Sequence, residues 1–186
     1  MVQLGFATPI GSTIPVSVRL EFAEQLEKLG YESYWLPHFL SRDVDGYDAL
    51  DVLSAVAGRT TKIKLGTDVL QVPLYQPVDL ARRVVTLDHL SNGRFILGVG
   101  IGFIPAEFAA LGVPFQERGA RMEEALDIMI RLWTEEEVTY EGKYYQLKET
   151  VLAPKPVQKP HPGILMGGLH SNIQRGAPGA SRKGGW

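Results

Sequence analysis

The segment Leu90-Ser91-Asn92-Gly93-Arg94-Phe95-Ile96-Leu97-Gly98-Val99-Gly100-Ile101-Gly102-Phe103 holds the clearest structural signal in this chain. A Ser-Asn-Gly turn leads into an apolar run that is typical of a buried strand, and alternating glycines follow at the end of that strand. Glycine at a strand end lets a flat ligand or another part of the backbone approach closely, and both interpretations are open. A dinucleotide fingerprint does not fit, because the third glycine of G-x-G-x-x-G would fall at Phe103.

Helical and strand-like segments alternate on both sides of this strand. The pattern predicts strands over 3–7, 33–36, 63–67, 95–99 and 164–166. It predicts helices over 15–30, 47–58 and 118–133, and another that opens at Pro77, and the first is expected to bury Val18, Phe22, Leu26 and Leu29. A hairpin is predicted from 138–140 and 144–146. Strands that alternate with helices indicate an α/β fold with a parallel sheet, either doubly wound or closed as a (β/α)8 barrel.

Ligands bind at the carboxyl ends of the strands in both architectures. The residues that follow the predicted strands are small, polar or glycine, as a binding rim requires. They are Thr8-Pro9, Pro37-His38, Asp68-Val69, 98–102 and Gly167-Gly168.

Composition excludes several classes of protein. The chain has 186 residues, 45% of them hydrophobic, and a net charge of −2 without a basic stripe, so we expect neither a nucleic-acid partner nor a membrane partner. It has no cysteine, its four histidines lack metal-ligand spacing, and no G-x-S-x-G elbow is present, so we expect no metal site and no serine hydrolase. The N-terminus lacks the pattern of a signal peptide, and we expect a cytoplasmic protein.

Seven segments, in order, resemble the luciferase-like monooxygenase superfamily, and within it the branch of coenzyme F420-dependent oxidoreductases. The similarity runs from Met1 to about Gly168. The matching segments are 23–35, 62–70 with Pro73 and Pro77, 87–94 with the glycine strand, 107–115, 117–121, 141–145 and 154–162.

The resemblance implies a TIM-barrel-like fold that binds coenzyme F420, or alternatively FMN, in the mouth of the barrel. It places Gly98, Gly100 and Gly102 close to the ring of the cofactor, and Gly167 and Gly168 near its phosphate. It also implies a non-prolyl cis peptide between Asp68 and Val69 at the end of the third strand, which makes both residues cofactor-binding candidates. The reaction would be an oxidoreductase or monooxygenase reaction on a small organic substrate.

Two positions depart from the family pattern. Relatives carry Asp-His after the tryptophan of the second strand, whereas here His38 stands one place early and without the aspartate. His38 is the catalytic candidate, because a histidine transfers protons near neutral pH. Some deazaflavin dehydrogenases have a glutamate where Phe103 stands, so Phe103 favours an apolar wall for the substrate.

Length sets the competing hypothesis. A complete barrel needs about 250 residues, and the pattern supplies only about the first five β/α units, as a partial barrel domain over 1–168 with an atypical Gly/Pro-rich tail over 169–186. The alternative to an active enzyme is therefore a truncated, catalytically inactive family member that at most binds flavin as a homo-oligomer. A barrel hydrolase or lyase that uses His38 and Asp68 is a third class, with no nucleophile or metal to support it.

Overall fold

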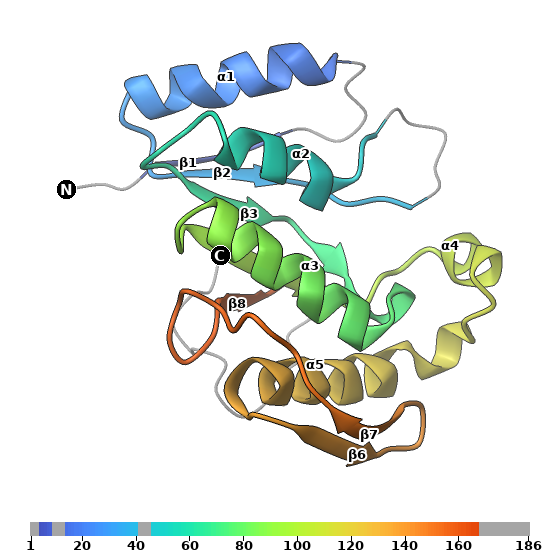
Figure 1. Ribbon diagram of the computed structural model, residues 1–186. Coiled ribbons are helices and arrows are strands. Elements are labelled where there is room, and N and C mark those ends of the chain that lie inside the picture. Colours follow the sequence, from blue (N-terminus) through green and yellow to red (C-terminus); the bar gives the residue numbers. More distant parts are fainter. Residues whose placement is uncertain (1–3, 9–13, 41–45, 168–186) are drawn as a thin grey trace.

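The computed structural model describes residues 4–8, 14–40 and 46–167. Six short strands form one parallel sheet (Figure 1). They are β1 (Gly5–Ala7), β2 (Ser33–Leu36), β3 (Lys64–Thr67), β4 (Leu70–Gln71), β5 (Phe95–Gly100) and β8 (Gly163–Met166). The spatial order is β1, β2, β3, β5 and β8, with β4 continuing β3 along the same edge of β5. Because this order follows the chain without a reversal, the sheet is an arc of a barrel and not a doubly wound sheet.

Helices connect the strands, as expected for βα units. They are α1 (Val16–Lys28), α2 (Ala49–Ala57), α3 (Pro77–Leu90), the short α4 (Pro105–Ala110) and α5 (Arg118–Thr134), with 3-10 turns η1 (Val72–Leu74) and η2 (Phe115–Glu117). The predicted hairpin is confirmed as β6 (Val138–Glu141) and β7 (Gln146–Thr150), which lie beside α5 (Figure 1). Within the described ranges, no helix is long and apolar enough to cross a membrane.

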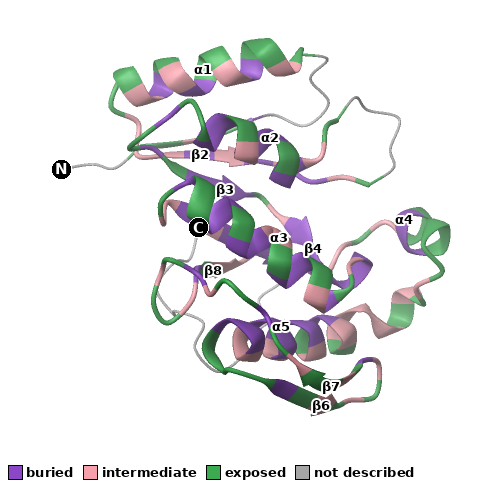
Figure 2. Cartoon of the chain, viewed as in Figure 1, coloured by how far each residue is buried: buried purple, intermediate pink, exposed green. Residues whose placement is uncertain are grey.

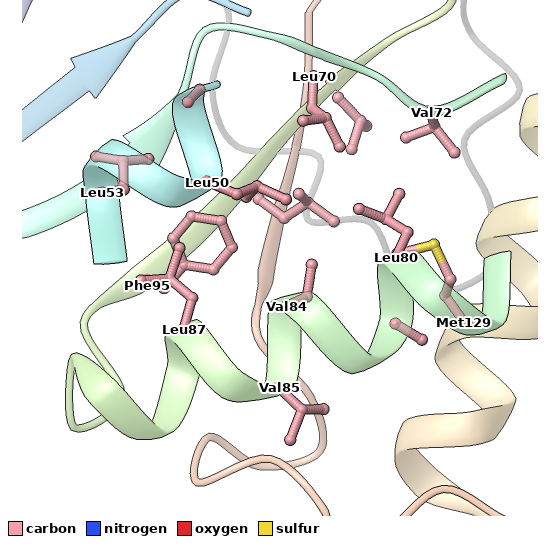
Figure 3. Close-up of a cluster of buried hydrophobic side chains, with 14 of the residues drawn as sticks. Leu50, Leu53, Leu70, Val72, Leu80, Val84, Val85, Leu87, Phe95 and Met129 are labelled. Carbon is pink, nitrogen blue, oxygen red and sulfur yellow. The ribbon is translucent and has the colours of Figure 1, made fainter. Parts of the chain in front are cut away.

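The core lies between the helices and one face of the sheet (Figure 3). Phe95 and alternate residues of β5 are fully buried there, together with Leu80, Val84 and Leu87 of α3 and Met129 of α5. Burying one such side chain contributes about 1.5–3 kcal/mol. This layer fixes the direction of β5 and with it the position of the glycine segment.

Helix α1 packs through a different stripe from the one that the sequence predicts. Figure 2 shows buried and exposed stripes along α1. The buried residues are Arg19, Ala23 and Leu26, whereas Val18, Phe22 and Leu29 are exposed. Only Leu26 of the expected face is confirmed. Apolar spacing alone does not distinguish two stripes that are one residue apart on a helix. The small side chain of Ala23 is fully buried in the stripe that packs. Phe22, on the neighbouring stripe, contacts the ring of Phe6.

The third barrel strand is interrupted by a bulge. Three residues lie between Gly66 and Leu70, whereas only two lie between their partners Ile96 and Val99 on β5. The strand formed by β3 and β4 therefore carries one extra residue. The peptide bond between Asp68 and Val69 within this bulge is cis, as the resemblance implied. The sequence pattern did not reveal the second half of the strand, β4.

Candidate functional site

The carboxyl ends of the strands bring most of the predicted site residues onto one rim. His38 follows β2, Asp68 and Val69 form the bulge between β3 and β4, Gly98 and Gly100 lie in β5, and Gly167 follows β8. Backbone hydrogen bonds join these ends: the N–H of Asp68 donates to the carbonyl of Leu36 at 2.8 Å, and that of Gly167 to Val99 at 2.8 Å. Gly168 lies outside the described residues.

The glycines make room for the bulge. A Cβ at Gly98 would lie 1.8 Å from the Thr67 carbonyl oxygen, and one at Gly100 would lie 2.6 Å from Val69 Cγ2. A Cβ at Gly167 would lie 2.5 Å from Val69 Cγ1. The side chain of Val69 therefore sits between the ends of β5 and β8. Of the two interpretations of the glycine run, close approach by another part of the chain is the one that the structure contains.

Gly102 has a separate role at the end of this segment. Its φ is 77°, a conformation that favours glycine, and a Cβ there would lie 2.5 Å from Gln71 Oε1 and 2.9 Å from the Phe108 ring. Gly102 thus turns the chain from β5 toward α4 while the Gln71 side chain packs against it. Cofactor binding by Gly98, Gly100, Gly102 and Gly167 stays a prediction, with Val69 and Gln71 as the side chains that lie against them.

His38 is held in a buried polar cluster. Its side chain is almost fully enclosed, and Nε2 lies 2.6 Å from the hydroxyl oxygen of Tyr75 and 3.9 Å from the Asp48 carboxylate. Asp48 is placed there because it caps the N-terminus of α2, where its carboxylate accepts from the N–H groups of Leu50 and Asp51. Arg83 of α3 binds the same carboxylate at 3.1 Å.

Burial lowers the pKa of His38 below its ordinary value, and this effect exceeds the opposing attraction of the Asp48 and Glu107 carboxylates. The imidazole is therefore neutral at neutral pH. A neutral imidazole has one donor and one acceptor nitrogen, which lets it hold or accept a proton beside a bound ligand.

A second buried pair lies beside His38. Glu107 of α4, at 0% exposure, accepts from Gln71 Nε2 at 2.9 Å and from the backbone N–H of Leu40 at 3.0 Å. The carboxylate thus ties the loop after β2 to β4. The sequence analysis missed Tyr75, Gln71 and Glu107, and it predicted no helix at α4. Pro105 with Glu107 in the same first turn is a helix-start signal that could have located α4.

Two buried polar atoms of this cluster, His38 Nδ1 and Gln71 Oε1, have no hydrogen-bond partner among the described residues. Buried polar atoms are normally paired, so these atoms are suited to a polar ligand edge. A flavin or deazaflavin ring, which is flat and apolar on its faces and carries amide-like donors and acceptors on its edge, matches an apolar step at Val69 with polar atoms nearby.

The remaining candidates lie apart from this cluster. Asp68 and Phe103 are exposed on the rim. His89 Nε2 contacts the carbonyl of Lys155 at 2.8 Å, and His161 Nδ1 contacts the carbonyl of Pro162 at 2.8 Å, so both have structural partners. His170 lies outside the described residues. Within the described ranges no group of three or more metal-ligating side chains is present.

Comparison with known proteins matches residues 4–177 to the family described as luciferase-like monooxygenase. An F420-dependent glucose-6-phosphate dehydrogenase from Kineococcus radiotolerans is 42% identical over 74% of this chain and 43% of its own length. A 4-hydroxyprotoasukamycin monooxygenase from Streptomyces nodosus subsp. asukaensis is 38% identical over 74% of this chain and 38% of its own length.

The fold agrees with these matches. The crystal structure of monooxygenase RslO1 from Streptomyces bottropensis superposes with a TM-score of 0.81 and 28% identity, over 89% of this chain and 53% of that one. The chain thus spans about half the length of the relatives and the structure that it matches. With a family match over most of its residues and a sheet that follows half of a known barrel, this chain belongs to the luciferase-like monooxygenase family.

Proposed function

We propose that this chain binds coenzyme F420, with FMN as the alternative, at the Val69 bulge, and that it takes part in the oxidation or reduction of a small organic substrate. The bulge carries the proposal, because it places an apolar side chain at the carboxyl ends of the strands, on the same rim as the buried, neutral His38. The F420 dependence named for the Kineococcus relative supports this cofactor over FMN.

Each residue of the rim has a role in the proposal. The bound cofactor supplies the hydride or oxygen chemistry. Val69 supports one face of the ring, and Gly100 and Gly167 leave the space that holds Val69 in position. His38 binds the polar edge and holds a proton there. Phe103, which is 64% exposed at the end of the glycine segment, forms an apolar wall for the substrate.

Cofactor titration of the 186-residue protein tests the proposal. We expect F420 to change its fluorescence on binding, and we expect Val69→Ala to weaken that binding at least tenfold, about 1.4 kcal/mol. Val85→Ala is the matched control, because Val85 is a buried valine of α3 away from the rim. Equal affinities for Val69→Ala and Val85→Ala, or no binding of either cofactor by the wild-type protein, would refute the proposed site.

A catalytically inactive protein that at most binds flavin as an oligomer is the second candidate. Among the described strands, β1 and β8 each pair with one neighbour only, and a sheet that does not close favours this candidate. Turnover separates the two: an active enzyme oxidises or reduces bound cofactor when an organic substrate is added, whereas the inactive protein binds cofactor without any change in its absorbance spectrum.

A further inference from the structure

The strongest unexplained contact in the site joins His38 to Tyr75. The Tyr75 hydroxyl oxygen lies 2.6 Å from His38 Nε2, and the ring centroids are 5.6 Å apart. Tyr75 directly follows η1, so it belongs to the loop between the bulged strand and α3. Because His38 is almost fully buried, this hydrogen bond lies where water competes least for either partner.

The direction of the proton in this hydrogen bond follows from the neighbours of Tyr75. Burial, followed by the nearby Asp48 carboxylate, raises the pKa of Tyr75, so the hydroxyl keeps its proton at neutral pH. The guanidinium carbon of Arg83 lies 5.9 Å from the centroid of the Tyr75 ring, and a guanidinium group only donates, so Arg83 offers no acceptor for the hydroxyl proton. Among the described residues, His38 Nε2 is the acceptor within reach of the hydroxyl proton.

We infer that Tyr75 is a positioning residue that holds neutral His38 in the tautomer with its proton on Nδ1. Nε2 accepts from the Tyr75 hydroxyl, so it carries no proton of its own. Nδ1 is then an N–H donor, and it is the atom of His38 that lacks a partner among the described residues. Under the proposed function, on which this role in binding rests, Nδ1–H is the donor that His38 offers to a carbonyl or anionic acceptor of a bound ligand.

Among the residues that the structure describes, the charged and titratable groups that face His38 are Asp48 at the start of α2, Arg83 of α3, Glu107 of α4 and Tyr75. Asp48 lies nearest to Nε2, and a carboxylate there would attract a proton to Nε2. The Tyr75 hydroxyl and the Asp48 carboxylate therefore favour opposite tautomers. Their removal, one at a time, gives results with opposite signs.

The test is 15N NMR of the histidine side chains in the 186-residue protein without cofactor, so it does not depend on cofactor binding or turnover. The His38 signals are assigned by their loss in His38→Gln. We expect the wild-type protein to show a protonated Nδ1 and a bare Nε2. In Tyr75→Phe we expect the tautomer ratio to shift toward Nε2–H by about tenfold, as the loss of one buried hydrogen bond predicts.

The pKa of His38 gives a second readout. A donor to the bare Nε2 favours the neutral imidazole, so Tyr75→Phe should raise the pKa of His38 by about one unit. Asp48→Asn should lower the pKa and leave the proton on Nδ1, because Tyr75 still donates and asparagine still caps α2. Tyr140→Phe, in the β6–β7 hairpin, is the matched control and should change neither quantity.

The wild-type spectrum alone decides the tautomer, so the inference can be refuted even if Tyr75→Phe does not fold. A protonated Nε2 in the wild-type protein would overturn it. An unchanged tautomer ratio and an unchanged His38 pKa in a folded Tyr75→Phe protein would overturn it as well. Failure to bind F420 or FMN would refute the proposed function and leave this assignment of the proton in place.

Discussion

Val69 is the residue on which the site geometry depends. Its two γ-methyl groups face Gly100 and Gly167, which belong to different strands, so a single bulged residue fills the space beside both. A side chain at either glycine would therefore displace Val69, whether or not a ligand is bound. The glycine run is therefore explained first by packing of the bulge, and a cofactor ring would lie on Val69.

We predict that Gly100→Ala lowers the free energy of unfolding by about 1–3 kcal/mol, because the new Cβ overpacks against Val69. Val69→Ala in the same chain removes the obstructing methyl groups, so the double variant should recover part of the loss. Urea denaturation of the wild-type protein, the two single variants and the double variant measures the coupling free energy between positions 69 and 100. Gly119→Ala is the control: it lies in α5 with no atom within 4 Å of its Cβ and should be neutral or stabilising. Additive losses from Gly100→Ala and Val69→Ala would contradict the packing argument.

His38 should make stability depend on pH. Its pKa is lower in the folded chain than in the unfolded chain, so the folded state binds fewer protons between the two values. Stability therefore rises with pH up to about 6.5 and is fully present above that. We predict that the melting temperature falls as the pH decreases below about 6.5, and that His38→Gln removes part of this fall.

The control for this pH series is His89→Gln, since His89 lies at the exposed end of α3. That variant should keep the wild-type pH dependence. If His38→Gln and wild type lose stability in parallel from about pH 7 to about pH 5, burial of the neutral imidazole makes no contribution and the prediction is wrong.

Among single residues, the sequence identifies those whose type is uncommon at the end of a strand or matches a family pattern. It misses site residues whose neighbours in the sequence give no such signal. His38, Asp68-Val69 and the glycines were found because they stand at strand ends or match a family pattern. The sequence around Tyr75, Gln71 and Glu107 is ordinary. Only the tertiary fold brings these residues, from a loop, the short strand β4 and the short helix α4, to His38. Local periodicity carries no information on such contacts.

Among the elements, the connector before β8 has the most specific anchor. Asp88, at 0% exposure near the end of α3, accepts from the N–H of Val157 at 2.6 Å and from the N–H and side chain of Gln158 at 3.1 and 2.7 Å. Gln158 also donates to the carbonyl of Phe95, at the start of β5. These bonds set the entry of the chain into β8 and so the position of Gly167.

We predict that Asp88→Ala destabilises the protein by about 2–4 kcal/mol, because it leaves buried N–H groups without an acceptor. Amide hydrogen exchange should show the largest loss of protection in 156–166, since that segment depends on the carboxylate. Asp88→Asn keeps one acceptor oxygen and should lose less. Equal loss of protection across α1 and β8 would mean that Asp88 acts on the whole fold and does not anchor this connector.

Helices show how far a periodic pattern reaches. The pattern places α2, α3 and α5 and their buried faces well, since Leu80, Val84 and Leu87 or Met122, Leu126 and Met129 lie in the core. It chooses the wrong stripe for α1, where polar Arg19 is buried and Phe22 is exposed. The difference arises because α1 contacts α2 and the short strand β1, so a narrow stripe suffices to cover them. Of the expected face, Phe22 contacts the rings of Phe6 and Tyr34. Val18 and Leu29 stay exposed.

The described residues form an open arc of sheet whose two outer strands each have an unpaired edge. Among the described strands, β1 pairs only with β2, and β8 pairs only with β5. On the face away from the helices, Gly5 is exposed and Trp35 and Ile96 are only half-buried. In and directly after α1, Val18, Phe22 and Leu29 are 46%, 39% and 74% exposed. Apolar surface of this kind beside an unpaired strand favours association with another chain.

We therefore predict that the 186-residue chain self-associates or melts without a cooperative transition. Apolar burial contributes about 25 cal/mol per Å², and a domain has a net free energy of unfolding of only about 5–15 kcal/mol. The burial that is missing on an uncovered sheet face is therefore large compared with the stability of the domain. Sedimentation velocity across a concentration series, with thermal melting, measures both properties. Leu29→Lys with Val18→Glu should weaken association through the region of α1. Leu90→Lys, at an exposed leucine that ends α3, should not. A sharp thermal transition from a protein that is monomeric at all concentrations would contradict this prediction. It would show that five barrel strands with their helices are stable without a closed barrel to protect the strand edges.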